Sequence, residues 1–359
     1  MNASPDDAPV LLRREGGAGH IVLNRPRAIN ALNHAMVRLM DEALSAWQAD
    51  ESVATVVLTG AGERGLCAGG DIRSIHDDVR AGGGGASAAF WHDEYRLNAR
   101  IARFPKPYVA VMDGIVMGGG VGVSAHGSVR VVTERSRVAM PETGIGFVPD
   151  VGGTYLLTRA PGELGTHLAL TGTAVGAGDA LLCGLADHYV PSERLEEFTA
   201  ALADSEASDA VRRCAAAVPA GELAAHREWI DHCYAADTVE EIVDRLHACG
   251  DRHAKQTAET ILTKSPTSLK VTLAALRRAR ELPSLEAVLD QEYRVSCAAL
   301  GSPDLPEGIR AQVVDKDRRP RWSPAALELV TEADVARFFE GVGPKAPHLR
   351  CRSGTDGLG

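Results

Sequence analysis

The chain has 359 residues, of which 45% are hydrophobic and only 4% aromatic, so a sizeable core can form mainly from aliphatic side chains. A formal net charge of -10 argues against a general nucleic-acid binder, which needs a basic face. No apolar run reaches the roughly 18 residues of a membrane-spanning helix, so we expect neither nucleic acid nor a membrane as a partner.

Short strand-like and helical patterns alternate over the first part of the chain. Apolar runs typical of strands occupy residues 20–23, 54–59, 108–112 and 129–132. Between the first two runs, apolar residues from Ile29 to Trp47 recur three or four positions apart, as they do on one face of a helix. This alternation predicts a layered α/β domain.

A glycine-rich stretch follows, and later in the chain the strand-like patterns give way to helical ones. Four consecutive glycines in residues 81–87 (AGGGGAS) predict a flexible surface loop after the charged segment 71–80. From about Glu193 strand-like runs vanish, and helical patterns predominate through residue 300, among them residues 269–280. The second part of the chain is therefore predicted to be helical.

Glycines at 118–120 follow a strand pattern and precede an apolar, helix-like segment. Free backbone N–H groups and the positive end of a helix coincide at such a junction, and glycine lets a ligand atom approach them closely. Two such groups aimed at one oxygen would form an oxyanion hole, with Gly69-Gly70 offering the second donor. Two tight turns explain the same glycines, and for each motif taken alone this is the more common explanation.

Two acidic residues lie in the apolar stretch 140–150 (MPETGIGFVPD). Desolvation there would raise the pKa of Glu142 toward the range that an acid or base needs, with a surface turn as the equally weighted alternative. Asp150 precedes a helical pattern over 151–156, and its residue type alone favours a helix N-cap. Ser124 and His126 lack the GxSxG context of a serine hydrolase, so we predict no catalytic triad.

The seven cysteines form no CxxC pair, and no Cys/His cluster has zinc-ligand spacing. Reduced thiols are the simplest interpretation of this pattern. The N-terminal residues are acidic and lack the apolar segment of a signal peptide. Together these features predict a cytoplasmic protein without a metal site.

The order and spacing of three segments resemble the crotonase (enoyl-CoA hydratase/isomerase) superfamily. The segments are CAGGDIR (67–73), KPYVAVMDGIVMGGGVG (106–122) and MPETGIG (140–146). The resemblance implies an α/β fold with a superhelical core of repeated ββα turns and an acyl-CoA site over residues 10–200. A helical C-terminal region over residues 201–345 would cover the site, and residues 346–359 would form a flexible tail.

A finer resemblance, over about residues 10–340, is to the 3-hydroxyisobutyryl-CoA hydrolase branch of this superfamily. Its markers include MGGGVGVSAHG (117–127), MPETGIGFVPDVGG (140–153), SPTSLKVT (265–272) and EGIRAQVVDKDRRPRWSP (307–324). The hydratases of the superfamily place a catalytic Glu three residues after the middle glycine of GGG, where this chain has Gly122. Hydration uses two carboxylates around one water, so the loss of one favours hydrolysis.

The resemblance also implies catalytic roles. The N–H groups of Gly70 and Gly119 would bind the thioester oxygen. Glu142 would attack the carbonyl carbon or activate a water, and the sequence does not separate a nucleophile from a base. Asp150 would orient the substrate hydroxyl or assist proton transfer.

The remaining implied roles concern binding. Glu94 would support the polar end of the acyl group, and Arg73 would approach a CoA phosphate. The implied substrate is a short branched 3-hydroxyacyl-CoA, first of all 3-hydroxyisobutyryl-CoA of valine degradation, and no cofactor is needed because CoA belongs to the substrate. An enoyl-CoA hydratase or isomerase and a catalytically silent acyl-CoA-binding protein are the alternatives. The oligomeric state stays open, with a homo-oligomer as one outcome.

Overall fold

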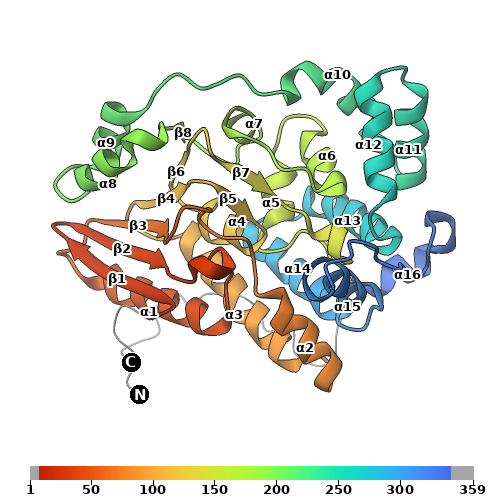
Figure 1. The fold of residues 1–359 in the computed structure, drawn as a ribbon, viewed down its shortest axis with the longest axis horizontal. Coiled ribbons are helices and arrows are strands. Elements are labelled where there is room, and N and C mark those ends of the chain that lie inside the picture. The colour runs from red at the N-terminus through yellow and green to blue at the C-terminus, as the bar shows by residue number, and fades with distance from the viewer. Residues whose placement is uncertain (1–7, 341–359) are drawn as a thin grey trace, which may run out of the picture.

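A six-stranded sheet forms the centre of the N-terminal part of the computed structural model, which describes residues 8–340 (Figure 1). Its strand order is β1-β2-β3-β4-β6-β8, and only the β1–β2 pair is antiparallel. A two-stranded parallel sheet, β5-β7, lies beside it. The strands are β1 (Val10–Glu15), β2 (Ala18–Leu23), β3 (Thr55–Gly60), β4 (Tyr108–Met112), β5 (Ile115–Met117), β6 (Val129–Val132), β7 (Arg137–Ala139) and β8 (His188–Tyr189).

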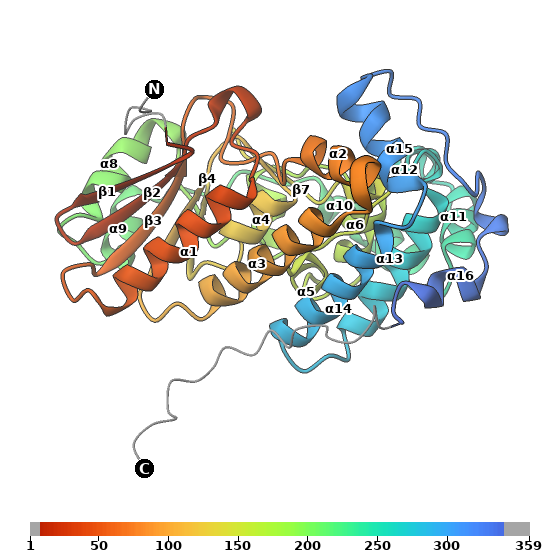
Figure 2. The same cartoon turned by 90° about the horizontal axis from the view of Figure 1, so that it is seen from below.

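The central strands are covered on both faces, which explains their continuous apolar runs. In β3, Val56 and Leu58 join the main hydrophobic core, whereas Val57 between them joins a second, smaller core. Helices α1 (His34–Ala49) and α3 (Gly85–Ala102) supply the main core on the first face, and α8 (Leu195–Ala201) and α9 (Ala207–Cys214) cover the other (Figure 2). The predicted α/β core is therefore confirmed.

Helices dominate the chain after β8, and those from α10 on stack at the end of the molecule opposite β1 (Figure 1). They are α10 (Leu223–Tyr234), α11 (Val239–Ala248), α12 (Arg252–Leu262), α13 (Pro266–Ala279), α14 (Leu285–Ala299), α15 (Asp304–Ile309), η5 (Arg310–Val314), η6 (Leu327–Leu329) and α16 (Glu332–Arg337). The other helices between strands are η2 (Pro26–Ala28), α2 (Ile72–Gly82), α4 (Gly119–Ser124), η3 (Glu142–Ile145), α5 (Gly153–Leu157), α6 (Leu164–Thr171) and α7 (Ala177–Leu182), and η4 (Ser192–Arg194) follows β8. The helical second half is confirmed, whereas the tail predicted over 346–359 lies outside the described residues. Among the described helices, none has the length and apolar character needed to cross a membrane.

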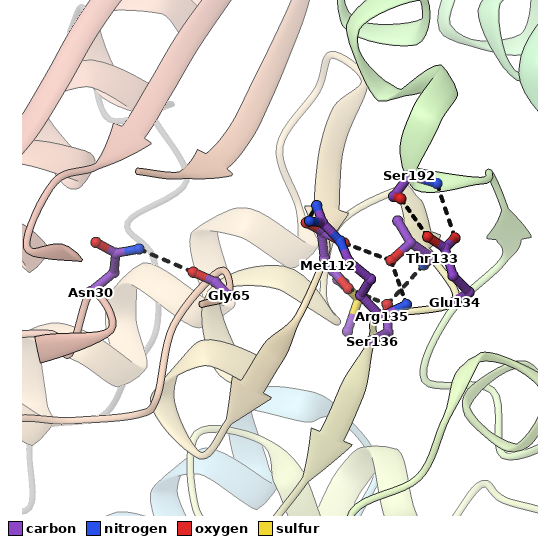
Figure 3. A network of polar contacts seen from close by, with 9 residues as sticks. Asn30, Gly65, Met112, Thr133, Glu134, Arg135, Ser136 and Ser192 are labelled. Atoms are coloured by element: carbon purple, nitrogen blue, oxygen red, sulfur yellow. Dashed lines mark hydrogen bonds and ion pairs between the residues drawn. The ribbon is translucent and has the colours of Figure 1, made fainter. Parts of the chain in front are cut away.

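Polar contacts fix the turns that lead from the large sheet into β5 and β7 (Figure 3). The hydroxyl of Ser136 donates to the carbonyl of Met112 at 2.6 Å and accepts from the N–H of Thr133 at 2.8 Å. On the neighbouring loop, the buried amide of Asn30 donates to the carbonyl of Gly65 at 3.1 Å. The loop at Gly65 leads to Gly70, and the turn after Met112 leads through β5 to Gly119, so these bonds help to position the two predicted amide donors.

The prediction of a flexible loop over residues 81–87 is wrong. Helix α2 continues to Gly82 and α3 begins at Gly85, so only Gly83 and Gly84 lie between them. Both glycines have left-handed backbone angles, with φ of 86° and 87°, and the N–H of Gly83 closes α2 on the carbonyl of Val79. The glycine run is therefore a tight helix–helix corner, because two positive-φ residues suffice to reverse the chain.

Candidate active site

A cleft of about 690 Å³ opens between α2, α3, the β5–α4 junction, η3 and the α15–η5 segment. Its volume falls within the usual range of small-molecule sites. All six residues predicted for the site line this cleft: Gly70, Arg73, Glu94, Gly119, Glu142 and Asp150. The helical C-terminal region contributes Lys264, Leu305, Gln312 and Val313 to its wall, as expected for a region that covers the site.

The amides of Gly70 and Gly119 lie next to each other because hydrogen bonds join their loops. The N–H of Met117 donates to the carbonyl of Cys67 at 3.0 Å, and α4 then begins at Gly119. A Cβ placed on Gly119 would lie 3.3 Å from the nitrogen of Gly70. Neither N–H has an acceptor among residues 8–340. The two amides can therefore bind one oxygen of a ligand, as an oxyanion hole requires.

Glu142 begins η3 and points its carboxyl group at the same glycine turn. Its Oε1 lies 2.7 Å from the place that a Cβ on Gly118 would take, and Oε2 is buried without a hydrogen-bond partner in the described part of the chain. Burial raises the pKa of Glu142 well above its usual range, and the charge of Asp150 raises it further. A surface turn is thus excluded for this residue, which is 6% exposed.

Asp150 is held by Tyr95 from α3. The tyrosine hydroxyl donates to Oδ2 of Asp150 at 2.7 Å and shares a second hydrogen bond of 2.8 Å with the hydroxyl of Ser296. Burial raises the pKa of Asp150 to about 7, while the bond from Tyr95 opposes this rise. Asp150 therefore titrates near neutrality, in the range where a group can exchange protons during a reaction.

The prediction that Asp150 is the N-cap of the following helix is wrong. Helix α5 begins at Gly153 with Gly152 as its cap residue, and no side chain of its own segment caps it. The free N–H groups are instead satisfied by Glu292 of α14, which accepts from Gly152 at 2.6 Å and from Thr154 at 2.9 Å. Because Glu292 caps the helix, the carboxyl group of Asp150 is released toward the cleft.

Glu292 is a site-supporting residue whose role the sequence analysis did not find. It lies 140 residues along the chain from Gly152, and it also accepts from the hydroxyl of Thr154 at 2.6 Å. The helical periodicity around residues 292–294 does not indicate this role. Ser296, four residues later on the same face of α14, forms a hydrogen bond with the hydroxyl of Tyr95.

Glu94 and two aromatic rings form the inner wall of the cleft. Glu94 is 2% exposed, and its Oε1 has no hydrogen-bond partner within residues 8–340. Burial raises its pKa well above the usual range, and Asp150 adds to the effect. Beside it, the rings of Trp91 and Phe147 stack at 5.2 Å between centroids. The wall thus combines an apolar face with acidic groups at one end.

Cations lie at the edges of the cleft. Arg73, in the first turn of α2, is exposed, and its Nη2 donates to the carbonyl of Val313 at 2.9 Å. Arg25 is already paired with Asp71 at 2.8 Å. Lys264 makes no ion pair with a described residue, and burial lowers its pKa. Arg73 and Lys264 therefore remain available to an anionic ligand.

The sequence also predicts that Ser124 and His126 form no catalytic triad and that the protein has no metal site. The hydroxyl of Ser124 donates to the carbonyl of Gly120 at 2.6 Å, and Nε2 of His126 donates to the carbonyl of Val151 at 2.8 Å. Both side chains thus bond backbone groups and not each other. Among the described residues no group of three or more His, Cys, Asp or Glu side chains has the arrangement to hold a metal ion.

Comparison with known proteins gives three kinds of match. The model of the family described as enoyl-CoA hydratase/isomerase matches residues 18–339. A relative from Rattus norvegicus named 3-hydroxyisobutyryl-CoA hydrolase, mitochondrial, is 42% identical over 96% of this chain and 92% of its own length. A crystal structure titled as a carnitinyl-CoA dehydratase from Mycobacterium thermoresistibile is 55% identical, with a TM-score of 0.92 over 96% of this chain and 99% of that one.

A second crystal structure, titled as an enoyl-CoA hydratase from Rhodobacter sphaeroides 2.4.1, is 43% identical. Its TM-score is 0.87 over 92% of this chain and 97% of that chain. The comparisons contradict the predicted cytoplasmic location, because the curated relative is named as a mitochondrial enzyme. Unpaired cysteines indicate only a reducing environment, and this is why they did not identify a compartment.

Proposed function

The chain belongs to the enoyl-CoA hydratase/isomerase family, and we propose that it hydrolyses the thioester of a short branched 3-hydroxyacyl-CoA, first of all 3-hydroxyisobutyryl-CoA. The products are 3-hydroxyisobutyrate and CoA, which places the reaction in valine degradation. The name of the relative that is 42% identical over 96% of the chain supports this substrate. The structural observation that carries the proposal is the environment of Gly122.

Gly122 stands where the hydratases that this chain resembles have a catalytic Glu. A Cβ at this position would lie 2.6 Å from the Cβ of Val151 and 3.0 Å from Nδ2 of Asn98. A glutamate therefore does not fit without displacing α3 or the segment before α5. Without this carboxylate, the chain lacks one of the two carboxylates with which a hydratase adds water across a double bond. We infer that the remaining acids catalyse hydrolysis instead.

The remaining groups support acyl transfer. The thioester oxygen accepts hydrogen bonds from the N–H groups of Gly70 and Gly119, which stabilise the negative charge that develops on it. Glu142 faces the carbonyl carbon from the Gly118 side. It either attacks that carbon, giving an anhydride that water then hydrolyses, or takes a proton from the attacking water. In both routes the C–S bond breaks and CoA leaves as the thiolate.

The shape of the inner wall supports a small branched acyl group. The stacked rings of Trp91 and Phe147 offer an apolar face to a methyl branch. Glu94 and Asp150 lie at the polar end, where Asp150 can orient the 3-hydroxyl group. Arg73 stands at the edge of the cleft, on the first turn of α2, and binds a CoA phosphate.

A hydratase or dehydratase is the second candidate, because the two crystal structures reported above carry such titles. The two functions differ in the bond that is broken. A thiol reagent detects free CoA only when the thioester is cleaved, whereas hydration consumes the conjugated double bond of an enoyl-CoA and leaves the thioester intact.

The experiment presents purified enzyme with 3-hydroxyisobutyryl-CoA and with a short 2-enoyl-CoA, and it follows thiol release and enone absorbance in parallel. We expect thiol release from the first substrate and no loss of the enone from the second. Glu142→Gln is the matched control for trace contaminants. Enone loss without thiol release would assign the hydratase function, and tight binding without either signal would assign a silent acyl-CoA-binding protein.

A further inference from the structure

The carboxyl group of Glu94 borders the same small space as the two glycine amides. The Cβ that Gly119 lacks would lie 2.7 Å from Oε1 of Glu94 and 3.3 Å from the nitrogen of Gly70. The space in which the two amides can bind an oxygen therefore borders Oε1 of Glu94. Whether this third contact helps or hinders the reaction depends on the charge of the carboxyl group.

No ion pair with a described residue stabilises a negative charge on Glu94. Its Oε1 is buried and accepts no hydrogen bond, and the side chain makes no ion pair. Besides burial, the charge of Asp150 before α5 raises the pKa of Glu94, and the charge of Glu94 in turn raises the pKa of Glu142 of η3. An ionised Asp150 or Glu142 would repel an ionised Glu94.

Helices packed against α3 turn their own charged groups elsewhere. His34 of α1 pairs with Asp93, and His76 of α2 pairs with Asp77. From α14, Glu292 faces the α5 N-terminus, where it accepts hydrogen bonds from backbone N–H groups. Neither histidine is therefore paired with Glu94, and desolvation favours the neutral form of this acid.

We propose that Glu94 acts as a neutral carboxylic acid and donates a hydrogen bond to the thioester oxygen, as a third oxyanion donor beside Gly70 and Gly119. An ionised carboxylate at this place would oppose the charge that develops on the oxygen, whereas a neutral acid stabilises it. The proton stays on Glu94 throughout, and the electron pair of the broken C–S bond leaves with the CoA thiolate. The inference rests on the proposed thioester cleavage and names a further catalytic group for it.

The proposal assigns different charges to the carboxyl groups of Glu94 and Glu142. Glu142 must be ionised to act as nucleophile or base, while Glu94 must be neutral to donate, and a negative charge on Glu94 would raise the pKa of Glu142. A bound thioester favours this distribution because its oxygen lies at Glu94 and its electrophilic carbon lies before Glu142. The bound substrate thus favours the state in which Glu94 is protonated and Glu142 is ionised.

The kinetic test compares Glu94→Gln with Glu94→Ala. Glutamine is neutral at every pH and keeps an N–H donor, so we expect kcat for thiol release to fall by about tenfold or less. Alanine removes the donor and should cost about 10²–10³ in kcat, the usual effect of losing one oxyanion donor. At high pH the wild-type rate should fall as Glu94 ionises, and this fall should disappear in Glu94→Gln. Equal losses in both variants would overturn the proposal.

A second substrate separates the thioester oxygen from the 3-hydroxyl group as the partner of Glu94. Isobutyryl-CoA has the same branched thioester but no hydroxyl. If Glu94 donates to the thioester oxygen, the wild-type to Glu94→Ala ratio of kcat is the same for both substrates. A ratio near one with isobutyryl-CoA would assign Glu94 to the hydroxyl and contradict the proposal.

A spectroscopic measurement tests the protonation state without turnover. The infrared difference spectrum of wild type minus Glu94→Gln at pH 7 should contain the C=O stretching band of a neutral carboxylic acid. A difference spectrum with only carboxylate bands would show that Glu94 is ionised and would refute the inference, even if the thioester is cleaved. Conversely, the acid band with no thiol release from any acyl-CoA would sink the proposed function alone.

Discussion

The hydroxyl of Tyr95 donates a hydrogen bond of 2.7 Å to Oδ2 of Asp150, and both side chains are buried. Ser296 meets the same hydroxyl at 2.8 Å, so the proton of Tyr95 is directed at Asp150. This bond stabilises the ionised form of Asp150 in a site whose other acids have strongly raised pKa values. Tyr95 therefore opposes the effect of burial on the pKa of Asp150.

Tyr95→Phe should shift the pH dependence of thioester cleavage. Removal of the hydroxyl takes away the donor that lowers the pKa of Asp150, so that pKa rises above about 7. The acid limb of the kcat profile should therefore move to higher pH. Ser296→Ala is the matched control, because it leaves the Tyr95–Asp150 bond in place. An unchanged profile in Tyr95→Phe would mean that ionisation of Asp150 does not limit the reaction.

Gly119→Ala should damage catalysis more than folding. The added Cβ would come within 2.7 Å of Oε1 of Glu94 and 3.3 Å of the nitrogen of Gly70, which closes the space for the thioester oxygen. We expect a loss of about 10²–10³ in kcat. Gly82→Ala is the control, since a Cβ there meets nothing within 4 Å. Near-wild-type turnover by folded Gly119→Ala would remove this residue from the oxyanion hole.

Arg73→Ala should raise KM for the acyl-CoA and leave kcat nearly unchanged. A contact with a phosphate far from the thioester is equally strong in the ground state and in the transition state. Arg80, near the other end of α2, is also exposed but does not line the cleft, so Arg80→Ala should leave both constants at the wild-type level. If Arg73→Ala keeps the wild-type KM, Arg73 does not bind CoA.

Buried acids should make the protein less stable as the pH rises. The pKa of Asp150 is about 7 in the folded chain against 3.8 for an unperturbed aspartate, so between about pH 4 and 7 the folded state holds a proton that the unfolded state has lost. The free energy of unfolding then falls by up to about 1.4 kcal/mol per pH unit for this proton. Urea titrations should show a smaller fall in Asp150→Asn. Parallel pH curves for both proteins would contradict the raised pKa.

Local patterns predicted those parts of the molecule that depend on neighbouring residues. The apolar runs at 54–59 and 108–112 predicted β3 and β4 because both strands are buried on two faces. The sharp turn at Gly118, where φ is 48°, needs glycine, so the GGG motif also indicated the amide donors. The structure brings all six predicted site residues to one cleft, while their roles stay predictions until they are measured.

Long-range contacts explain what the sequence did not predict. The N-cap assigned to Asp150 failed because Glu292, from a helix that follows 140 residues later, satisfies the same N–H groups. The loop assigned to residues 81–87 failed because Asp78 accepts from both the N–H and the hydroxyl of Ser87 at 2.7 Å, and this fastens α2 to α3. Neither partner can be identified from spacing within a window of one helix.

Thioester cleavage by Glu142→Gln tests the central claim most directly. The amide keeps the shape of the side chain but removes both the nucleophile and the base, while the N–H donors of Gly70 and Gly119 remain. We predict that kcat for CoA release from 3-hydroxyisobutyryl-CoA falls by at least about 10²–10⁴, with a much smaller change in KM and an unaltered circular dichroism spectrum. A folded Glu142→Gln enzyme that releases CoA at the wild-type rate would contradict the account.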